Sequence, residues 1–265
     1  GRSDLFARTF PQLRGDWDGY EAYLVRYGER FEDIAKTYGL TPEKLRDLNG
    51  IDSAFIVRGG TLIVVPRIAA ELLAKNRAEA EAELYHADVA PGGPDDPMLV
   101  AVPDKTFRIP GRRRVFYRVV AGDDLTTVAA VFGAKVADVA AWNGLERDAR
   151  IQPRMVLALF VDEQFDATRA QVALLDEKRL AVVTAGSEEH LDLVEARKGR
   201  RRLTVVAKKG DTLESIGRRF GLTKYDLARI NRRGYSTPLV KGEALIVYAV
   251  VDRVNTTFAV WMGST

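Results

Sequence analysis

The sequence predicts an α+β protein made of three copies of one strand-helix-helix-strand module. Three observations lead to this fold class. One pattern recurs without a gap in residues 23–66, 117–160 and 205–248. Each copy holds two short segments whose apolar residues lie three or four positions apart, the spacing of one helix face. Each copy also begins and ends with an extended apolar run, which is typical of strands.

The first element of each copy is an extended stretch that runs into a glycine and an acidic residue. The stretches are YLVRY from Tyr23, YRVVA from Tyr117 and VVAKK from Val205. The glycine and the acid are Gly28 with Glu29, Gly122 with Asp123, and Gly210 with Asp211. A glycine there permits the tight turn that leads into a helix.

The next segment is predicted to be a short helix with one apolar face. Its apolar trios are Phe31, Ile34 and Tyr38; Leu125, Val128 and Phe132; and Leu213, Ile216 and Phe220. The acid or Thr212 ahead of the helix can cap the amides of its first turn. A second glycine, at Gly39, Gly133 or Gly221, suits the left-handed residue that ends such a helix.

A second short helix and a closing strand complete each copy. Thr41 and Thr223 are placed to cap this helix, with Pro42 at its first position. The expected buried pairs are Leu45 with Leu48, Val139 with Trp142, and Leu227 with Ile230. Asn49, Asn143 and Asn231 follow, and we expect each asparagine to take the left-handed turn. The closing strands are TLIVVP from Thr61, MVLALF from Met155 and ALIVYA from Ala244.

The stretches outside the copies are predicted to be structured spacers. We assign residues 1–22 to a lead-in, 67–116 and 161–204 to the two spacers, and 249–265 to a β-prone tail. The first spacer begins with a helix, IAAELLAKNRAEAEAELYHA, which PGGPDDP from Pro91 ends. Strands are expected at MLVAVP, VFYRVV and RLAVVTAG, and a helix from Ser187 to Lys198. We expect these stretches to pack on the neighbouring modules.

Composition excludes several classes of site. The 265 residues include no cysteine, so a disulfide scaffold, a thiolate zinc cluster and a cysteine nucleophile are all ruled out. No run approaches the roughly twenty apolar residues that would span a bilayer, and the start GRSDLFARTF has no apolar signal core. His86 and His190 have no suggestive partners. We therefore expect no cofactor, no metal site and no membrane span.

The formal net charge of +3 hides a local excess of cations near the third copy. This cluster is Arg197, Lys198, Arg200, Arg201, Arg202, Lys208, Lys209, Arg218 and Arg219, with few acids nearby. It is either a solvated face or a surface that attracts a polyanion. No RNA-binding aromatic signature, zinc motif or recognisable DNA-reading helix accompanies it or Arg112, Arg113 and Arg114. We expect no nucleic-acid partner.

The third copy, VVAKKGDTLESIGRRFGLTKYDLARIN, closely resembles the LysM domain, a βααβ fold that binds polysaccharides containing N-acetylglucosamine. The second copy keeps Gly122, Asp123 and Leu125 but has Asp124 in place of threonine. The first departs further, with Arg30 and Phe31. The resemblance implies three LysM modules joined by spacers, with ligand contacts best preserved in the third copy and least in the first.

In LysM domains the ligand groove lies between the first strand-to-helix loop and the loop before the last strand. Carried over to the third copy, this implies Gly210, Asp211, Thr212, Leu213, Asn231, Arg232, Arg233, Gly234 and Tyr235. The second copy supplies Gly122, Asp123, Asp124, Leu125, Asn143, Gly144 and Leu145. Each has a purely structural alternative as a turn, cap, core or helix-end residue, so loop amides are favoured over side chains. Tyr235 is the better side-chain candidate, because its face can stack on a sugar ring.

The order of copies and spacers is also similar to the C-terminal half of D-type lytic murein transglycosylases, whose catalytic domain lies upstream. The only Glu-Ser pair, Glu214-Ser215, falls inside a predicted helix without the aromatic and glycine-rich stretch of that active site. The resemblance implies a chain without catalysis that binds peptidoglycan or a chitin-like glycan in the periplasm or cell wall. The alternative is a protein-interaction scaffold that keeps the LysM fold but no longer binds glycan.

Overall fold

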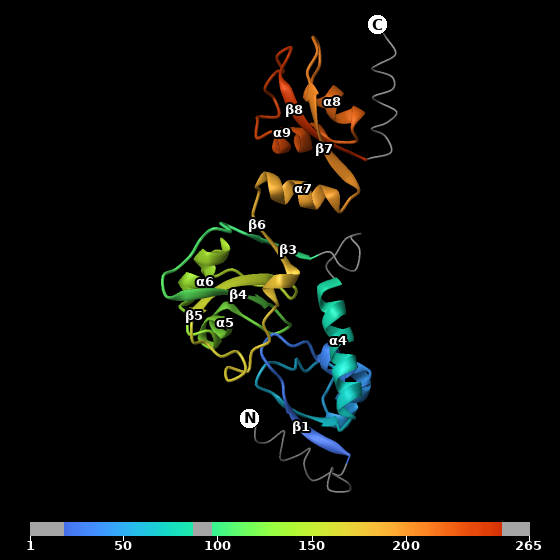
Figure 1. Ribbon diagram of the computed structural model, residues 1–265, viewed down its shortest axis with the longest axis vertical. Helices are drawn as coiled ribbons and strands as arrows, with labels where there is room; N and C mark the ends of the chain where they lie inside the picture. Colours follow the sequence, from blue (N-terminus) through green and yellow to red (C-terminus); the bar gives the residue numbers. More distant parts are fainter. Residues whose placement is uncertain (1–18, 87–96, 251–265) are drawn as a thin grey trace. The chain divides into compact units, whose positions relative to one another are not determined.

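The structure is a computed structural model that describes residues 19–86 and 97–250 (Figure 1). The described residues form two compact units. One comprises residues 19–86 and 102–182, and the other comprises residues 97–101 and 183–250. All but the last residue of the segment PGGPDDP, most of the lead-in and nearly all of the predicted β-prone tail lie outside the described residues.

Each repeat is a strand, two helices and a strand, so the predicted α+β fold class is confirmed. Module 1 (residues 23–66) is built on β1 (Tyr20–Leu24), α2 (Phe31–Thr37), α3 (Pro42–Asn49) and β2 (Leu62–Pro66). Module 2 (residues 117–160) is built on β4 (Arg112–Arg118), α5 (Leu125–Val131), α6 (Val136–Asn143) and β5 (Val156–Asp162). Module 3 (residues 205–248) is built on β7 (Arg200–Val206), α8 (Leu213–Arg219), α9 (Lys224–Ile230) and β8 (Ala244–Val250).

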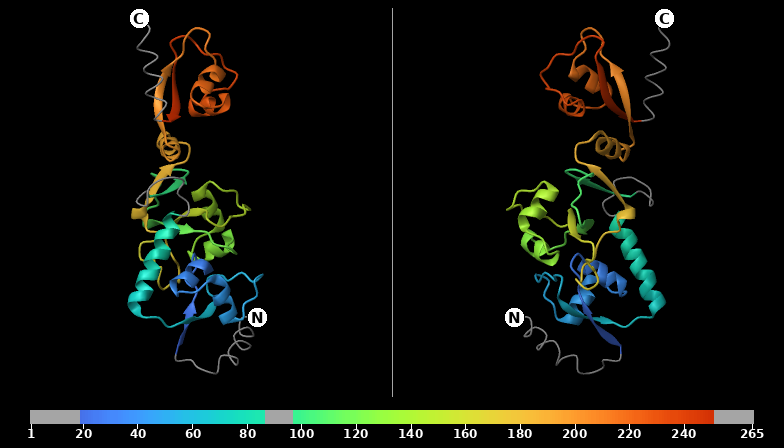
Figure 2. Two further views of the ribbon diagram at one scale, coloured as in Figure 1. Left: turned by 90° about the vertical axis from the view of Figure 1, so that its right-hand side faces the viewer. Right: turned by 60° about the vertical axis from the view of Figure 1, so that its left-hand side comes forward.

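The two strands of each module pair antiparallel, and the two helices cover one face of the pair (Figure 2). In module 3 the register places Val205 opposite Leu245. The predicted apolar trios line the cores: Phe31, Ile34, Tyr38, Leu125, Val128, Phe132, Leu213 and Ile216 are buried, and Phe220 packs partly buried against its cluster. Burial of these faces is the main stabilising contribution in modules this small.

The caps predicted for the second helices are confirmed at Thr41 and Thr223. The Thr41 hydroxyl accepts a hydrogen bond from the Lys44 amide, with Pro42 at the first position of α3, and Thr223 accepts from Asp226 in the same way. The acids Glu29 and Asp123, expected to cap the first helices, do not do so: Arg30 precedes α2 without a side-chain cap, and Asp124 caps α5. Gly39, Gly133 and Gly221 all have positive φ after the first helix. Chain reversal between the two helices therefore rests on local residue chemistry.

Two further expectations need correction. The first strands begin at Tyr20, Arg112 and Arg200, earlier than predicted, because the antiparallel ladders continue beyond the repeated pattern. The left-handed residue at the end of the second helix is not the asparagine. It is the next residue, Gly50, Gly144 or Arg232, with φ of 60°, 64° and 50°.

The spacers contain α4 (Ala70–His86), β3 (Met98–Val102), the 3-10 turn η1 (Glu177–Arg179), β6 (Leu180–Thr184) and α7 (Glu188–Ala196). The spacer helices and strands expected from the sequence are therefore present. The Ser187 hydroxyl caps α7 by accepting a hydrogen bond from the His190 amide.

The spacers pack on the modules inside each unit. Helix α4 lies along α2, where Lys36 forms an ion pair with Glu83 and Asn76 donates to the Thr37 carbonyl. Helix α7 packs on β7 in the second unit. Among the described residues no single helix is long and apolar enough to cross a membrane. Taken together, the described helices α5 and α6 are long and apolar enough for a membrane span by length and composition alone, but the chain bends by 105° between them.

Candidate functional site

The candidate site of each module lies between two loops. The first loop joins the first strand to the first helix and comprises residues 25–30, 119–124 or 207–212. The second loop joins the second helix to the last strand and comprises residues 50–61, 144–155 or 231–243. The Val25 amide donates to the Thr61 carbonyl, Val119 donates to Met155, and Ala207 donates to Glu243, at 2.8 to 2.9 Å. The two loops are therefore held together at their bases.

The acidic residue of each first loop stabilises its own turn. A carboxylate oxygen of Asp211 accepts a hydrogen bond from the Lys208 amide at 2.8 Å, and Asp123 accepts from the Val120 amide at 2.9 Å. Asp123 also accepts from the Tyr117 hydroxyl. Burial raises the pKa of Asp123, although these hydrogen bonds oppose the shift. The carboxylate of this acid therefore accepts hydrogen bonds within its own loop and stabilises the turn.

The asparagine of each module ties the second helix to the last strand. In module 3, Asn231 Nδ2 donates to the carbonyls of Leu227 and Ile246, and Oδ1 accepts from the Ile246 amide. Asn49 and Asn143 make the same three hydrogen bonds in modules 1 and 2. Both amide protons are used, so these side chains have no donor left for a ligand.

Five further predicted site residues also have structural roles. Thr212 caps α8 by accepting from the Ser215 amide, and Asp124 caps α5 by accepting from Thr127. Leu213 and Leu125 are buried in the cores of their modules. Leu145 packs partly buried against the module 2 core.

Four more predicted residues lie on the second loop of module 3. Arg233 holds this loop together through an ion pair with Glu243 and hydrogen bonds to the carbonyls of Thr237 and Pro238. Arg232 is exposed and donates to the Gly186 carbonyl. Gly234 and Tyr235 are exposed. Of the predicted side chains, Tyr235 alone combines a ring with broad exposure to solvent, at 58%.

The first loop of module 1 is covered by a segment of the same unit. The Tyr27 amide donates to the Gln171 carbonyl and the Ala173 amide donates to the Tyr27 carbonyl, both at 2.8 Å. A Cβ added to Gly28 would lie 2.9 Å from the Ala173 carbonyl oxygen and from the Tyr117 ring. The backbone of residues 171–173 therefore occupies this edge of module 1.

Module 2 is partly covered in a different way. A Cβ on Gly122 would lie 2.7 Å from Arg58 Nε and 3.0 Å from the Ile56 side chain, both on the second loop of module 1. On its second loop, a Cβ on Gly144 would lie 3.2 Å from Pro103. Contacts inside the first unit thus narrow both walls of this candidate groove.

Module 3 leaves the equivalent edge open. Gly210 is exposed, and no described atom lies within 4 Å of the position that a Cβ on it would take. Lys209 corresponds to Tyr27 in the repeat, and within the described residues its amide and carbonyl make no hydrogen bond like those of Tyr27. Backbone groups on this loop are therefore available to a ligand.

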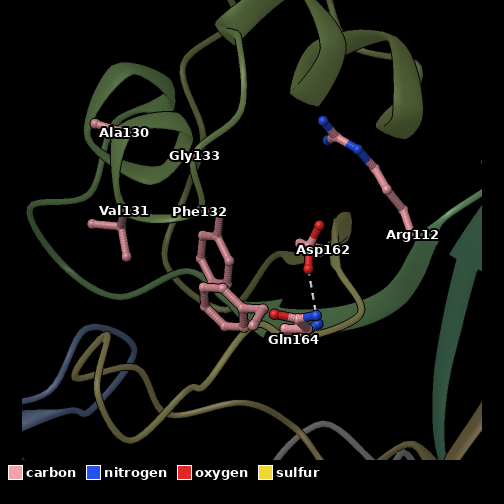
Figure 3. Close-up of a pocket in the computed structure, with 8 residues that line it drawn as sticks. Arg112, Ala130, Val131, Phe132, Gly133, Asp162 and Gln164 are labelled. Atoms are coloured by element: carbon pink, nitrogen blue, oxygen red, sulfur yellow. Dashed lines mark hydrogen bonds between the residues drawn. The ribbon is translucent and has the colours of Figure 1, made fainter.

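A pocket of about 460 Å³ lies elsewhere, at the end of α5 in module 2 (Figure 3). It is lined by Arg112, Ala130, Val131, Phe132, Gly133, Asp162, Gln164 and Phe165. The rings of Phe132 and Phe165 stack with centroids 5.6 Å apart, and the Gln164 backbone amide donates a hydrogen bond to Asp162 Oδ1. None of the predicted site residues lines this pocket.

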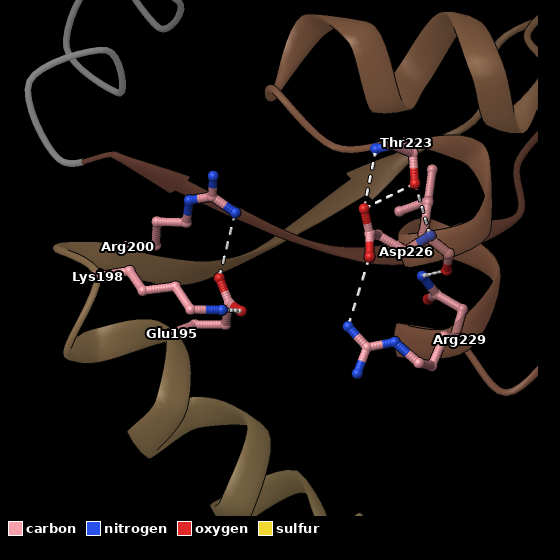
Figure 4. A network of polar contacts seen from close by, with 8 residues as sticks. Glu195, Lys198, Arg200, Thr223, Asp226 and Arg229 are labelled. Atoms are coloured by element: carbon pink, nitrogen blue, oxygen red, sulfur yellow. Dashed lines mark hydrogen bonds and ion pairs between the residues drawn. The ribbon is translucent and has the colours of Figure 1, made fainter. Parts of the chain in front are cut away.

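The basic cluster around module 3 is more neutralised than the sequence suggests. Arg200 and Lys198 both pair with the buried Glu195 (Figure 4), and Arg202 pairs with Glu188 and Asp192. Arg218 pairs with Glu214, and Arg219 pairs with Asp211. The expectation that these cations face few acids is wrong, because α7, α8 and the first loop of module 3 bring carboxylates beside them.

The described residues present no group of three or more His, Cys, Asp or Glu side chains that could hold a metal ion. His190 Nδ1 lies 3.0 Å from the Gly186 amide, in the turn ahead of α7. Glu214 is exposed on α8 and pairs with Arg218 at 3.0 Å. A general acid is usually positioned within a cleft, whereas Glu214 lies on an exposed helix face.

Sequence reasoning missed the residues that cover modules 1 and 2, namely Ile56, Arg58 and the segment 171–173. It also missed Tyr225, whose ring lies beside Tyr235 with centroids 5.3 Å apart. The repeat carried a signal for Tyr225, because the equivalent positions are Glu43 and Ala137. An aromatic residue at this position is not part of the repeated pattern and does not contribute to the core of the module.

The fold defines an array of three small βααβ modules. The LysM domain family matches residues 23–66, 117–160 and 205–241. The chain therefore carries three LysM domains.

A search of curated proteins finds similarity to the Autolysin of Enterococcus faecalis (strain ATCC 700802 / V583), at 26% identity over 226 residues. The match covers 85% of this chain but only 24% of the autolysin. Among solved structures, the spore cortex-lytic enzymes SleL of Bacillus cereus and Bacillus megaterium QM B1551 are each 16% identical, with a TM-score of 0.17. They cover 52% and 53% of this chain, and the chain covers 24% of each.

Proposed function

We propose that this chain binds N-acetylglucosamine-containing glycan, above all bacterial peptidoglycan, and that module 3 provides the main site. LysM domains are glycan-binding modules without catalysis of their own, which supports the general class. The observation that carries the choice of module is the open first loop at Lys209 and Gly210, set against covered loops in modules 1 and 2.

The contact in module 1 supports this choice chemically. There the Tyr27 backbone binds two peptide groups of the same chain, one through its N–H and one through its C=O. An acetamido group offers the same donor and acceptor atoms and no charge. The Lys209 backbone is the equivalent edge, so an acetamido group on a sugar is a suitable ligand for it. The proposed contacts are the loop amides around Gly210, with Tyr235 on the opposite loop.

The test is sedimentation of the purified chain with insoluble peptidoglycan, beside chitin and cellulose, at low and moderate salt. We expect retention on peptidoglycan at both salt concentrations, because uncharged loop recognition is weakly screened. Loss of all binding at moderate salt would instead indicate a charge-driven contact with a polyanion. Absence of binding to any of the three polymers would favour the protein-interaction scaffold.

The array is further proposed to target a wall-degrading enzyme, as the LysM part of a lytic transglycosylase-like protein in the bacterial envelope or periplasm. The resemblance of the repeat order supports this context, and so does the autolysin, of which the chain spans 24%. We expect the chain alone to release no soluble fragments from peptidoglycan. Formation of anhydromuropeptides by the pure chain would overturn its non-catalytic role.

A further inference from the structure

Module 3 exposes a pair of tyrosines that neither of the other modules has. Tyr225 is the second residue of α9 and Tyr235 lies on the second loop, with ring planes inclined at 57°. Each is 58% exposed, more than any other aromatic side chain in the part of the chain that the structure describes. The pair therefore presents ring faces to solvent.

The fold does not require this pair. The positions equivalent to Tyr225 are Glu43 and Ala137, and those equivalent to Tyr235 are Ser53 and Arg147. Modules 1 and 2 form the same strands and helices without rings at these places. Neither tyrosine belongs to the core cluster of module 3. Because modules 1 and 2 fold without rings at these positions, the module fold does not need the pair.

A cation lies beside the two rings. Lys224 Nζ is 5.0 Å from the ring centroid of Tyr225 and 6.0 Å from that of Tyr235, within the range of a cation–π contact. Lys224 makes no ion pair with a described carboxylate. Module 3 has nine Lys and Arg residues and four Asp and Glu residues, a net charge of +5. Module 1 has six residues of each sign and module 2 has five of each sign, so both have a net charge of zero. The positive charge is therefore specific to this module.

We propose that Lys224, Tyr225 and Tyr235 form a subsite for a hexopyranose that carries a carboxylate substituent, within the glycan that module 3 binds. The inference rests on the proposed function. A sugar ring has an apolar face of C–H groups that stacks on an aromatic ring, and the two inclined rings offer faces of this kind. The ammonium group beside them then pairs with a carboxylate on the sugar. Neutral chitin lacks that carboxylate.

The test uses the full chain and two soluble oligomers of equal length. One is a chito-oligosaccharide, and the other is a peptide-free strand in which alternate N-acetylglucosamine residues carry a lactyl ether. We expect tighter binding of the lactyl strand. Tyr225→Ala should weaken binding of both oligomers by about 3- to 10-fold. Tyr225→Phe should keep the ring and the affinity.

A change at Lys224 should affect the affinity for the charged oligomer but not the affinity for the neutral one. Lys224→Gln should weaken only the lactyl strand, by about 2- to 5-fold, and the difference should shrink at high salt. Matched controls are Phe55→Ala, an exposed ring on module 1, and Lys75→Gln, an exposed lysine on α4. Neither control should change binding, and all variants should keep the thermal stability of the parent chain.

Two outcomes separate the subsite from the proposed function. A chain that binds glycan, with Tyr225→Ala and Lys224→Gln unchanged in affinity, would overturn the subsite alone. A chain that binds no oligomer and no peptidoglycan would overturn the proposed function itself. A peptide-bearing strand is the third arm. If Lys224→Gln weakens that strand alone, the subsite stands and its carboxylate belongs to the peptide rather than to the lactyl group.

Discussion

Asn231 and Ile246 exchange two hydrogen bonds through one side chain. Asn231 Nδ2 donates to the Ile246 carbonyl at 2.8 Å, and the Ile246 amide donates to Asn231 Oδ1 at 2.7 Å. The side chain thereby acts as an extra backbone partner for β8. Its recurrence in all three modules indicates that it belongs to the fold and not to the ligand.

Replacing Asn231 with alanine should therefore lower stability more than binding. Three hydrogen bonds are lost: the Ile246 amide and carbonyl lose their side-chain partner, while the Leu227 carbonyl keeps the Asn231 backbone amide. We therefore expect a loss of about 2 to 4 kcal/mol. Thermal or urea unfolding of the full chain measures this loss, with Asn143→Ala as the matched change in the first unit. A stable Asn231→Ala variant that no longer binds glycan would show that the asparagine contacts the ligand.

Replacing Gly210 with valine should weaken glycan binding strongly. Its φ of +86° is costly for any residue with a Cβ, by about 1 to 2 kcal/mol in the left-handed region, and the branched side chain would stand over the open loop. Gly199→Val is the control, because Gly199 has φ +69° and open space but lies outside the candidate groove. Equal loss of binding in both variants would mean that unfolding, rather than the loop, explains the effect.

Removing the Arg58 side chain should uncover the first loop of module 2. In a Gly210→Val background, where module 3 is disabled, Arg58→Ala should raise the residual affinity for chito-oligosaccharide by a few fold, roughly 1 kcal/mol or less. Titration of the two variants side by side measures the gain. If the affinity does not rise, Asp124 or the contact at Pro103 would be what limits glycan binding by module 2.

Acid should weaken module 3 partly through Asp226. The hydrogen bond from the Thr223 hydroxyl, assisted by the Thr223 amide and Arg229, holds the pKa of Asp226 below its usual value (Figure 4). A lowered pKa contributes stability that is fully present above the unfolded pKa, near 4, and that is lost as pH falls from there through the lower pKa of the folded state. Between pH 6 and 3, Tm should fall further for the parent chain than for Asp226→Asn, by about 1 to 4 °C. Parallel curves would contradict this role.

The sequence by itself determined the three modules, because their signals are local. Apolar spacing over one helix turn, a threonine cap ahead of Pro42 and a glycine after each first helix each act within a few residues. Their threefold recurrence in one register fixed the order of strands and helices. The extent of the strands was less well predicted, since a ladder is limited by its partner strand and not by the repeated pattern.

Only the tertiary structure decided which modules keep an open candidate groove. Nothing in the sequence near Gly28 or Gly122 shows that Ala173 and Arg58 will cover them, because those residues are brought there by the packing of the whole first unit. The same holds for the pairing of Tyr225 with Tyr235, which depends on how the second loop folds back along α9. Local patterns specify modules, whereas contacts between distant segments decide which surfaces remain free, since those contacts depend on the packing of the folded chain.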